Sequence, residues 1–234
     1  MVTLILADGE SPTRAELDAA WPGWDAGVDY IIAADGGARH ALGLGVTLDL
    51  WVGDGDSLGE DDLAALVAAG VPVERSRPDK DESDTELAVR AALRQDDGGL
   101  VIVGALGGPR VDHALANIGL LAMPELAGRV VTILDERSRI GLIQAPGPDG
   151  GAVERRLPGR SGDLVSLLPF GAGVEGVTTH GLAYPLVDEP LPPGPARGLS
   201  NVRTAGDAAV VVRRGMLLVV ESSATRRAPA TFRA

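Results

Sequence analysis

The stretch LWVGDGDS, residues 50–57, joins an apolar run to two carboxylates. Side chains alternate between the faces of a strand, so Asp54 and Asp56, two residues apart, point the same way where the strand ends. Gly53 and Gly55 leave the backbone bare, which allows a sharp turn or the close approach of a ligand. Adjacent carboxylates repel each other unless a cation lies between them, and Mg²⁺ prefers oxygen ligands. The stretch alone is compatible with a metal site or with an ordinary Asp-Gly turn.

Working outward, the N-terminal part of the chain alternates short apolar runs with helical patterns, which is typical of a sheet built from βαβ units. Strands are predicted at residues 2–7, 28–33, 48–52, 71–74, 100–103 and 129–134. Ser57 and Ser83 each precede an apolar periodic segment and are predicted to cap a helix. The capping-box form at Ser83, with Glu86 three residues later, strengthens the second of these predictions.

The pattern changes after residue 143, where the Pro- and Gly-rich segment 145–151 is typical of a linker or a hairpin loop. Beyond it, strand-like runs at 163–168, 182–187, 209–213 and 216–221 favour an all-β domain. Residues 213–215 are predicted to form a hairpin turn, and the tail from Ser223 is expected to fray. We therefore predict a mostly parallel, Rossmann-like α/β/α domain over residues 1–143 and a sandwich-like all-β domain over residues 144–234.

Composition excludes several classes of protein. A hydrophobic content of 45% suits a globular fold, and the net charge of −12 argues against a non-specific binder of nucleic acid or of a membrane surface. The absence of cysteine excludes disulfides, thiolate zinc sites and cysteine nucleophiles. No segment is apolar over the roughly 20 residues that a membrane helix needs, and the N-terminus does not resemble a signal peptide. A cytoplasmic protein is expected.

Polar and glycine-rich loops follow several of the predicted strands, at the edge where open α/β sheets bind ligands. There is no P-loop, but Gly104–Gly108 precedes a helix whose backbone N–H groups could hold an anion. Lys80 and Arg110 are the cations expected beside a phosphate there. For Lys80 the alternative is an exposed loop lysine, and for Arg110 it is a local ion pair with Asp112.

Seven motifs together are similar, in order and spacing, to the thiamine pyrophosphokinase family. They are Asp35-Gly36-Gly37-Ala38, Gly53-Asp54-Gly55-Asp56-Ser57, Lys80-Asp81-Glu82-Ser83-Asp84, Gly107-Gly108-Pro109-Arg110-Val111-Asp112-His113, Gly162-Asp163-Leu164-Val165-Ser166-Leu167, Gly181-Leu182-Ala183-Tyr184-Pro185-Leu186 and Leu199-Ser200-Asn201. The resemblance extends over nearly the whole chain.

The resemblance implies a homodimer with active sites between subunits, which transfers the diphosphate of ATP to thiamine and releases AMP. It implies that Asp54, Asp56 and Asp84 hold Mg²⁺, and that Lys80 and Arg110 join them in catalysis. The nucleotide and diphosphate site would be formed by Asp35, Gly36, Lys80, Gly107, Arg110, Asp112 and His113. The thiamine pocket would include Tyr184, Ser200 and Asn201, although Tyr184 could equally be a core residue of a sheet.

The chain departs from the family pattern at two positions. Pro109 is inserted between Gly108 and Arg110, which could shift Arg110 by one residue, and Ser83 replaces the more usual threonine.

Three other functions are alternatives to the family's reaction. They are a diphosphokinase for a pterin alcohol, a phosphatase with Asp54 as nucleophile, and a non-catalytic nucleotide- or thiamine-binding module. The motifs at 181–186 and 199–201 favour thiamine over a pterin. The full set of carboxylates argues against a module without catalysis.

Overall fold

The computed structural model describes residues 1–224 and divides by its contacts into two compact units. Unit 1 comprises residues 1–18 and 23–135, and unit 2 comprises residues 19–22 together with the chain from residue 136 onward. The predicted division after residue 143 falls within strand β7 (Ser138–Ala145) of unit 2. Most of the tail that was expected to fray lies outside the described residues.

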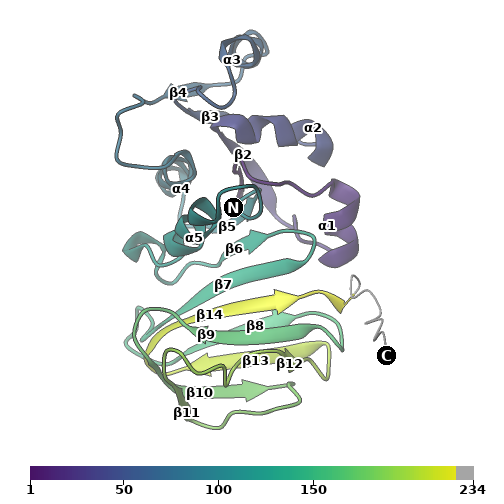
Figure 1. The fold of residues 1–234 in the computed structure, drawn as a ribbon, viewed down its shortest axis with the longest axis vertical. Coiled ribbons are helices and arrows are strands. Elements are labelled where there is room, and N and C mark those ends of the chain that lie inside the picture. Colours follow the sequence, from purple (N-terminus) through teal and green to yellow (C-terminus); the bar gives the residue numbers. More distant parts are fainter. Residues whose placement is uncertain (225–234) are drawn as a thin grey trace. The chain divides into compact units, whose positions relative to one another are not determined.

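The elements of the first 135 residues alternate as the βαβ pattern predicts (Figure 1). In chain order they are β1 (Val2–Leu6), α1 (Arg14–Ala20), β2 (Val28–Ala34), the 3-10 helix η1 (Asp35–Arg39), α2 (His40–Leu44), β3 (Leu50–Gly53), α3 (Glu60–Ala68), β4 (Val73–Arg75), α4 (Asp84–Gln95), β5 (Gly99–Val103), α5 (Val111–Leu120), the 3-10 helix η2 (Pro124–Leu126) and β6 (Val131–Leu134).

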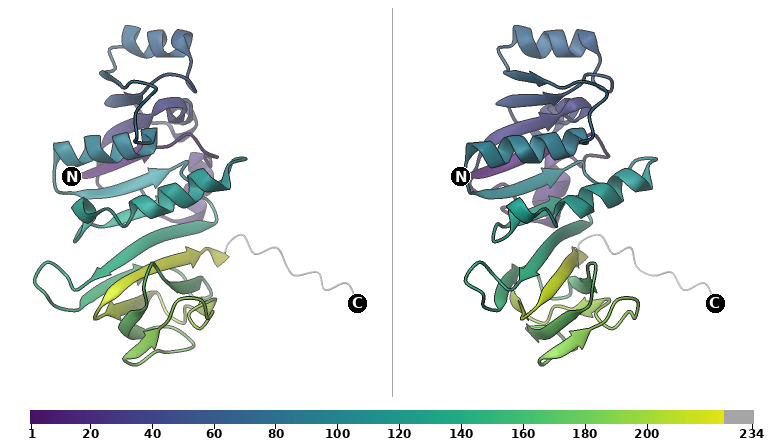
Figure 2. Two further views of the ribbon diagram at one scale, coloured as in Figure 1. Left: turned by 60° about the vertical axis from the view of Figure 1, so that its left-hand side comes forward. Right: turned by 90° about the vertical axis from the view of Figure 1, so that its left-hand side faces the viewer.

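The strands of unit 1 are arranged in the order β6-β5-β1-β2-β3-β4, and all of their pairings are parallel. Their apolar side chains are buried; β1, for example, is buried from Thr3 to Leu6. Helices α4 and α5 lie on one side of the sheet, in front of it in the right-hand view of Figure 2, and α1 and α2 lie on the other side. The predicted α/β/α architecture is confirmed.

Unit 2 contains two antiparallel sheets. One has the strand order β12-β9-β14-β7 and the other β11-β10-β13-β8. Its remaining strands are β8 (Val153–Pro158), β9 (Leu164–Pro169), β10 (Val174–His180), β11 (Glu189–Leu191), β12 (Asn201–Val202), β13 (Asp207–Val212) and β14 (Gly215–Ser222). Side chains from both sheets, such as Val165 of β9, Val177 of β10 and Val219 of β14, form one buried cluster. The predicted all-β sandwich is confirmed.

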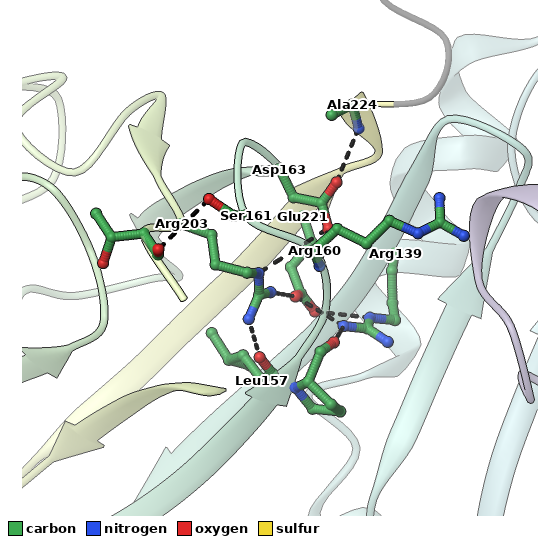
Figure 3. A network of polar contacts seen from close by, with 10 residues as sticks. Arg139, Leu157, Arg160, Ser161, Asp163, Arg203, Glu221 and Ala224 are labelled. Carbon is green, nitrogen blue, oxygen red and sulfur yellow. Dashed lines mark hydrogen bonds and ion pairs between the residues drawn. The ribbon is translucent and has the colours of Figure 1, made fainter. Parts of the chain in front are cut away.

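A buried ionic network lies at one end of this sandwich (Figure 3). Arg203 is 1% exposed and forms an ion pair with Glu221 of β14 and a hydrogen bond to the carbonyl of Leu157 of β8. Arg139 of β7 donates to the same glutamate, with Nε to Oε1 at 2.7 Å and Nη2 to Oε2 at 2.8 Å. Asp163 accepts backbone hydrogen bonds from Arg160 at 2.7 Å and from Ala224 at 2.8 Å. The network thus links strands of both sheets.

Three predictions about local structure were wrong. Ser57 does not cap a helix: α3 begins at Glu60, and its N-cap is Gly59, whose φ of 85° a glycine adopts without strain. Residues 182–187 form a loop in which Leu182 makes one isolated bridge with Arg203. Residues 213–215 do not form a hairpin turn, because β13 pairs with β8 and β10 in one sheet whereas β14 pairs with β7 and β9 in the other.

Among residues 1–224, no helix combines the length and the apolar character needed to cross a membrane.

Candidate active site

The parallel sheet of unit 1 brings several loops to one edge. Because neighbouring parallel strands run in the same direction, the segments after β1, β2, β3 and β5 all leave the sheet at its carboxyl end. The chain order also reverses there, since β2 and β5 lie on either side of β1. Such a switch point is where ligands bind in open α/β sheets.

Asp54 and Asp56 follow β3 at this edge, as the sequence predicts. Their carboxylates and that of Asp35 offer oxygen atoms that all lie within 4.8 Å of one another. The backbone N–H of Asp56 donates to Oδ1 of Asp54 at 3.1 Å, and the Ser57 hydroxyl donates to Oδ1 of Asp56 at 3.2 Å. The arrangement provides the hard oxygen donors that Mg²⁺ binds.

Asp35 differs from the other two carboxylates because it is buried, with 1% of its surface exposed. Its Oδ1 accepts a hydrogen bond from the Leu58 N–H at 2.9 Å, and its Oδ2 accepts from the N–H groups of Gly55 at 3.2 Å and Ser57 at 3.4 Å. Burial raises the pKa of this carboxyl, although the three backbone hydrogen bonds oppose the shift. Both oxygens therefore face the backbone of the 54–58 loop.

Lys80 joins Asp54 to Asp84, the first residue of α4. Its Nζ lies 2.8 Å from Oδ2 of Asp54 and 2.9 Å from Oδ1 of Asp84, and its side chain is 12% exposed. It is the only lysine in the chain, since every other one of the 21 basic residues is an arginine. The two carboxylates therefore share one compact positive charge, which offsets their mutual repulsion.

The protonation states follow from this arrangement. The hydrogen bond from Lys80 lowers the pKa of Asp54, so this carboxylate stays ionised. Burial acts to lower the pKa of Lys80, but its bonds to Asp54 and Asp84 outweigh burial and raise it. Oδ1 of Asp84 is buried, and burial raises the pKa of that carboxyl against the opposing effect of Lys80. Asp54 and Lys80 thus form a charged pair.

The glycine loops pack closely against the loop after β1. A Cβ on Gly36 would lie 2.2 Å from Oδ1 of Asp8, and one on Gly107 would lie 2.8 Å from Oε2 of Glu10. The backbone also pairs here, since Gly9 N–H donates to the Gly104 carbonyl at 2.7 Å. The loop after β1 thus supports both predicted glycine loops and adds two carboxylates to this edge.

Arg110, Asp112 and His113 stand at the start of α5. Arg110 is 63% exposed on its side chain and pairs with Asp112, with Nε to Oδ1 at 3.2 Å and Nη2 to Oδ2 at 2.5 Å. The hydrogen bond from Arg110 lowers the pKa of Asp112 to about 2. Within residues 1–224, no hydrogen bond or ion pair connects these two residues to Asp54, Asp56 or Asp84. The local ion pair considered from the sequence is present.

The predicted thiamine residues lie in unit 2, Tyr184 and Ser200 in loops and Asn201 at the start of β12. Tyr184 is 70% exposed, so it is not a core residue. Asn201 is buried, accepts from the Tyr184 N–H at 2.9 Å and donates to the Tyr184 carbonyl at 2.6 Å. Ser200 has a φ of 57°, and its N–H donates to the Ser166 hydroxyl at 3.0 Å. The amide of Asn201 thus fixes the backbone of the loop that presents Tyr184.

Two family models match the two parts of the chain in order. The thiamin pyrophosphokinase catalytic domain matches residues 24–132, and the thiamin pyrophosphokinase vitamin B1 binding domain matches residues 153–217. Together they cover well over half of the chain. This chain belongs to the thiamine pyrophosphokinase family.

Relatives within that family agree over most of their length. The thiamine pyrophosphokinase of Bacillus subtilis (strain 168) is 26% identical over 192 residues, which is 82% of this chain and 86% of the relative. A crystal structure of the B. subtilis protein matches with a TM-score of 0.76 at 24% identity, covering 96% of this chain and 100% of that one. The structure from Geobacillus thermodenitrificans gives a TM-score of 0.77 at 23% identity, covering 97% and 99% of the two chains. The last two likenesses show a shared fold.

The family's two domain models divide the predicted site residues. The metal and nucleotide candidates lie within the matched catalytic domain, and the thiamine candidates lie within the matched vitamin-binding domain. Sequence reasoning missed Asp8 and Glu10, although both follow soon after an apolar strand. It also missed Arg39, which donates to the carbonyls of Ser57 and Leu58. The position of Asp8 after β1 was the available signal; no local pattern marked Arg39.

Proposed function

We propose that this chain is a Mg²⁺-dependent thiamine diphosphokinase, which transfers the diphosphate of ATP to the hydroxyl of thiamine and releases AMP. The observation that carries the proposal is that both domains of one enzyme family match this chain in order. Within the part matched by the catalytic domain, Asp54, Lys80 and Asp84 lie together at one sheet edge. In this proposal unit 1 binds ATP and unit 2 provides the thiamine pocket.

Asp54, Asp56 and Asp84 would hold the metal, because all three offer carboxylate oxygens at this sheet edge. Oxygen atoms of Asp54 and Asp56 lie within 4.8 Å of each other, and Lys80 bridges Asp54 to Asp84. Asp35 is less suited to that role, since three backbone N–H groups occupy its oxygens. A divalent ion held by these residues would supply positive charge to the phosphates.

In the proposed reaction the thiamine hydroxyl attacks the β-phosphorus of ATP. A new oxygen–phosphorus bond forms, the bond from the β-phosphorus to the oxygen shared with the α-phosphate breaks, and AMP leaves with that oxygen. The hydroxyl proton passes to a base or to solvent. Catalysis of such a transfer is mostly positioning and neutralisation of charge. Lys80 would contribute a positive charge to the diphosphate, as Arg110 would after leaving Asp112.

A homodimer with active sites between subunits, in the cytoplasm, completes the proposal. Exposed apolar side chains support an association, among them Val111 and Leu115 on α5, which are 73% and 63% exposed. Sedimentation equilibrium would give the mass in solution, and a monomer at catalytic concentrations would contradict this part of the proposal.

Incubation of the pure protein with thiamine, ATP and Mg²⁺ tests the reaction. We expect equal amounts of thiamine diphosphate and AMP, separated and measured by chromatography. Formation of ADP with thiamine monophosphate, or the absence of turnover, would refute the proposal. A hydroxymethylpterin offered in place of thiamine should give no product.

The substitution Asp56→Asn tests the metal assignment. We expect turnover to fall by about 100-fold or more, because a charged oxygen ligand of the metal that neutralises the phosphates is lost. Far-ultraviolet circular dichroism should be unchanged, since Asp56 is exposed. Asp97→Asn removes the same charge at a fully exposed side chain and serves as the control. Wild-type turnover in Asp56→Asn would remove this residue from the site.

A further inference from the structure

The 3-10 helix η1 contacts the 54–58 loop with both of its ends. At its first residue, Asp35 accepts the N–H groups of Gly55, Ser57 and Leu58. At its last residue, Arg39 donates from Nη2 to the carbonyls of Ser57 at 2.7 Å and Leu58 at 2.8 Å. The carboxylate at one end of η1 therefore accepts from N–H groups of the loop, and the guanidinium at the other end donates to carbonyl groups of the same loop.

Asp35 is itself held in place. The indole N–H of the fully buried Trp51 donates to its carbonyl at 3.0 Å. Its φ of 43° lies in the left-handed region, which aspartate and asparagine adopt more readily than most residues. A Cβ added to Gly53 would lie 2.9 Å from the Cβ of Asp35, so the end of β3 and the start of η1 touch closely.

We infer that Asp35 and Arg39 are positioning residues that fix the 54–58 loop in the shape that presents Asp54 and Asp56 to a divalent cation. The inference deepens the proposed function and rests on its assignment of the metal to this loop. It reassigns Asp35, which the family resemblance placed among the nucleotide contacts, and it gives a role to Arg39, which carried no prediction.

The physical reason is preorganisation. Asp54 and Asp56 repel each other, so a loose loop would separate them and would have to be ordered again when a cation binds. The hydrogen bonds of Asp35 and Arg39 hold the loop through its backbone and do not involve the carboxylates of Asp54 and Asp56. Residues that support metal ligands in this way change metal affinity by about 10- to 100-fold when they are replaced.

The test compares wild type with Asp35→Asn and Arg39→Met. Asparagine tolerates the left-handed backbone but cannot accept all three N–H groups. The matched controls are Asp49→Asn, whose carboxylate accepts the Ile31 N–H at 2.9 Å, and Arg129→Met, whose guanidinium donates to the Asp96 carbonyl at 2.7 Å. Each control makes the same substitution at a side chain that contacts the backbone elsewhere in unit 1, and the amide oxygen of asparagine at position 49 can still accept the single Ile31 N–H.

Two measurements need no turnover. Hydrogen exchange of the metal-free protein measures the exchange rates of the backbone amides of Gly55, Ser57 and Leu58. We expect these amides to exchange faster in Asp35→Asn than in wild type. The electron paramagnetic resonance signal of free Mn²⁺ measures how tightly the protein binds this ion. We expect the affinity for Mn²⁺ to fall by about 10- to 100-fold in Asp35→Asn and by less in Arg39→Met. Both controls should match wild type, and the KM for thiamine should be unchanged in all four variants.

The outcomes separate the inference from the proposed function. Equal Mn²⁺ affinity in wild type and Asp35→Asn would overturn the inference, and so would weaker binding without faster loop exchange, because Asp35 would then act as a direct ligand. A wild type that binds no Mn²⁺ would also overturn it. Should wild type bind Mn²⁺ and both variants behave as expected without any formation of thiamine diphosphate, only the proposed reaction would fail. If Asp35→Asn does not fold, Arg39→Met provides the test, because the Arg39 side chain is half exposed.

Discussion

At the scale of single residues, Lys80 carries the most specific chemistry. It is the sole lysine, and it lies between Asp54 and Asp84. We expect Lys80→Met to lower turnover by about 100-fold, because it removes a positive charge from the reacting phosphates. Without metal the variant should also lose about 1–3 kcal/mol of stability, since two carboxylates lose their shared counter-charge. Steady-state kinetics and chemical denaturation measure the two effects.

Lys80→Arg is the matched comparison because it keeps the charge and changes its shape. A planar guanidinium does not replace a compact ammonium between two carboxylates, so turnover should stay well below wild type. Full turnover in Lys80→Met would show that this ammonium does not act on the substrate.

Some site residues could be predicted from their place after a strand or at the start of a helix, and others could not, because their side chains bind distant backbone groups. Asp54, Asp56, Lys80 and Asp84 were predicted, because they follow neighbouring strands or open a helix, and parallel strands bring such positions together. The contacts of Asp35 were not predictable, since its carboxylate binds backbone N–H groups 20 to 23 residues away. A pattern of side chains does not reveal where main-chain donors will lie.

At the scale of elements, the start of α4 places Asp84 at the site. The Ser83 hydroxyl accepts a hydrogen bond from the Glu86 N–H at 3.1 Å and caps the helix. We expect Ser83→Ala to cost about 1 kcal/mol of stability, because one helix N–H loses its partner. Ser83→Thr, which keeps the hydroxyl, should cost little. Urea denaturation measures both, and equal stability of the alanine and threonine variants would contradict the capping role.

Ser57 shows the limit of the same sequence rule. It precedes an apolar periodic segment, as Ser83 does, but its N–H is bonded to Asp35 and its hydroxyl to Asp56. The helix therefore starts later, after Gly59. A capping residue can be predicted from sequence only where no distant group competes for its hydrogen bonds.

At the scale of the whole molecule, the parallel arrangement of the strands could be predicted in unit 1, whereas in unit 2 only the all-β character could be predicted. Consecutive βαβ strands lie in parallel by a general rule, so the sheet edge followed from the sequence. In unit 2 the run 213–215 resembles a hairpin turn, yet it connects β13 of one sheet to β14 of the other. Two short apolar strands contain no local signal that decides which sheet each one joins.

The buried network of unit 2 gives a prediction at this scale (Figure 3). Glu221 is 4% exposed and serves both Arg203 and Arg139, so Glu221→Gln would remove the counter-charge that the two guanidiniums share. Arg203 would keep only the carboxylate of Asp163, whose Oδ2 lies 4.0 Å from its Nε. Loss of one partner from a buried ion pair costs about 3–5 kcal/mol. We expect the thermal unfolding of unit 2 to move to clearly lower temperature, followed by circular dichroism in the β region.

Glu175→Gln is the matched control, because it makes the same change in the same unit at an exposed ion pair. The side chain of Glu175 is 54% exposed and that of its partner Arg214 is 70% exposed. Exposed pairs contribute little to stability because water screens them, so this variant should unfold close to wild type. Equal losses in the two variants would mean that water reaches the Glu221 network. A larger loss in Glu221→Gln would show that the charged contacts between strands of both sheets hold this end of the sandwich together.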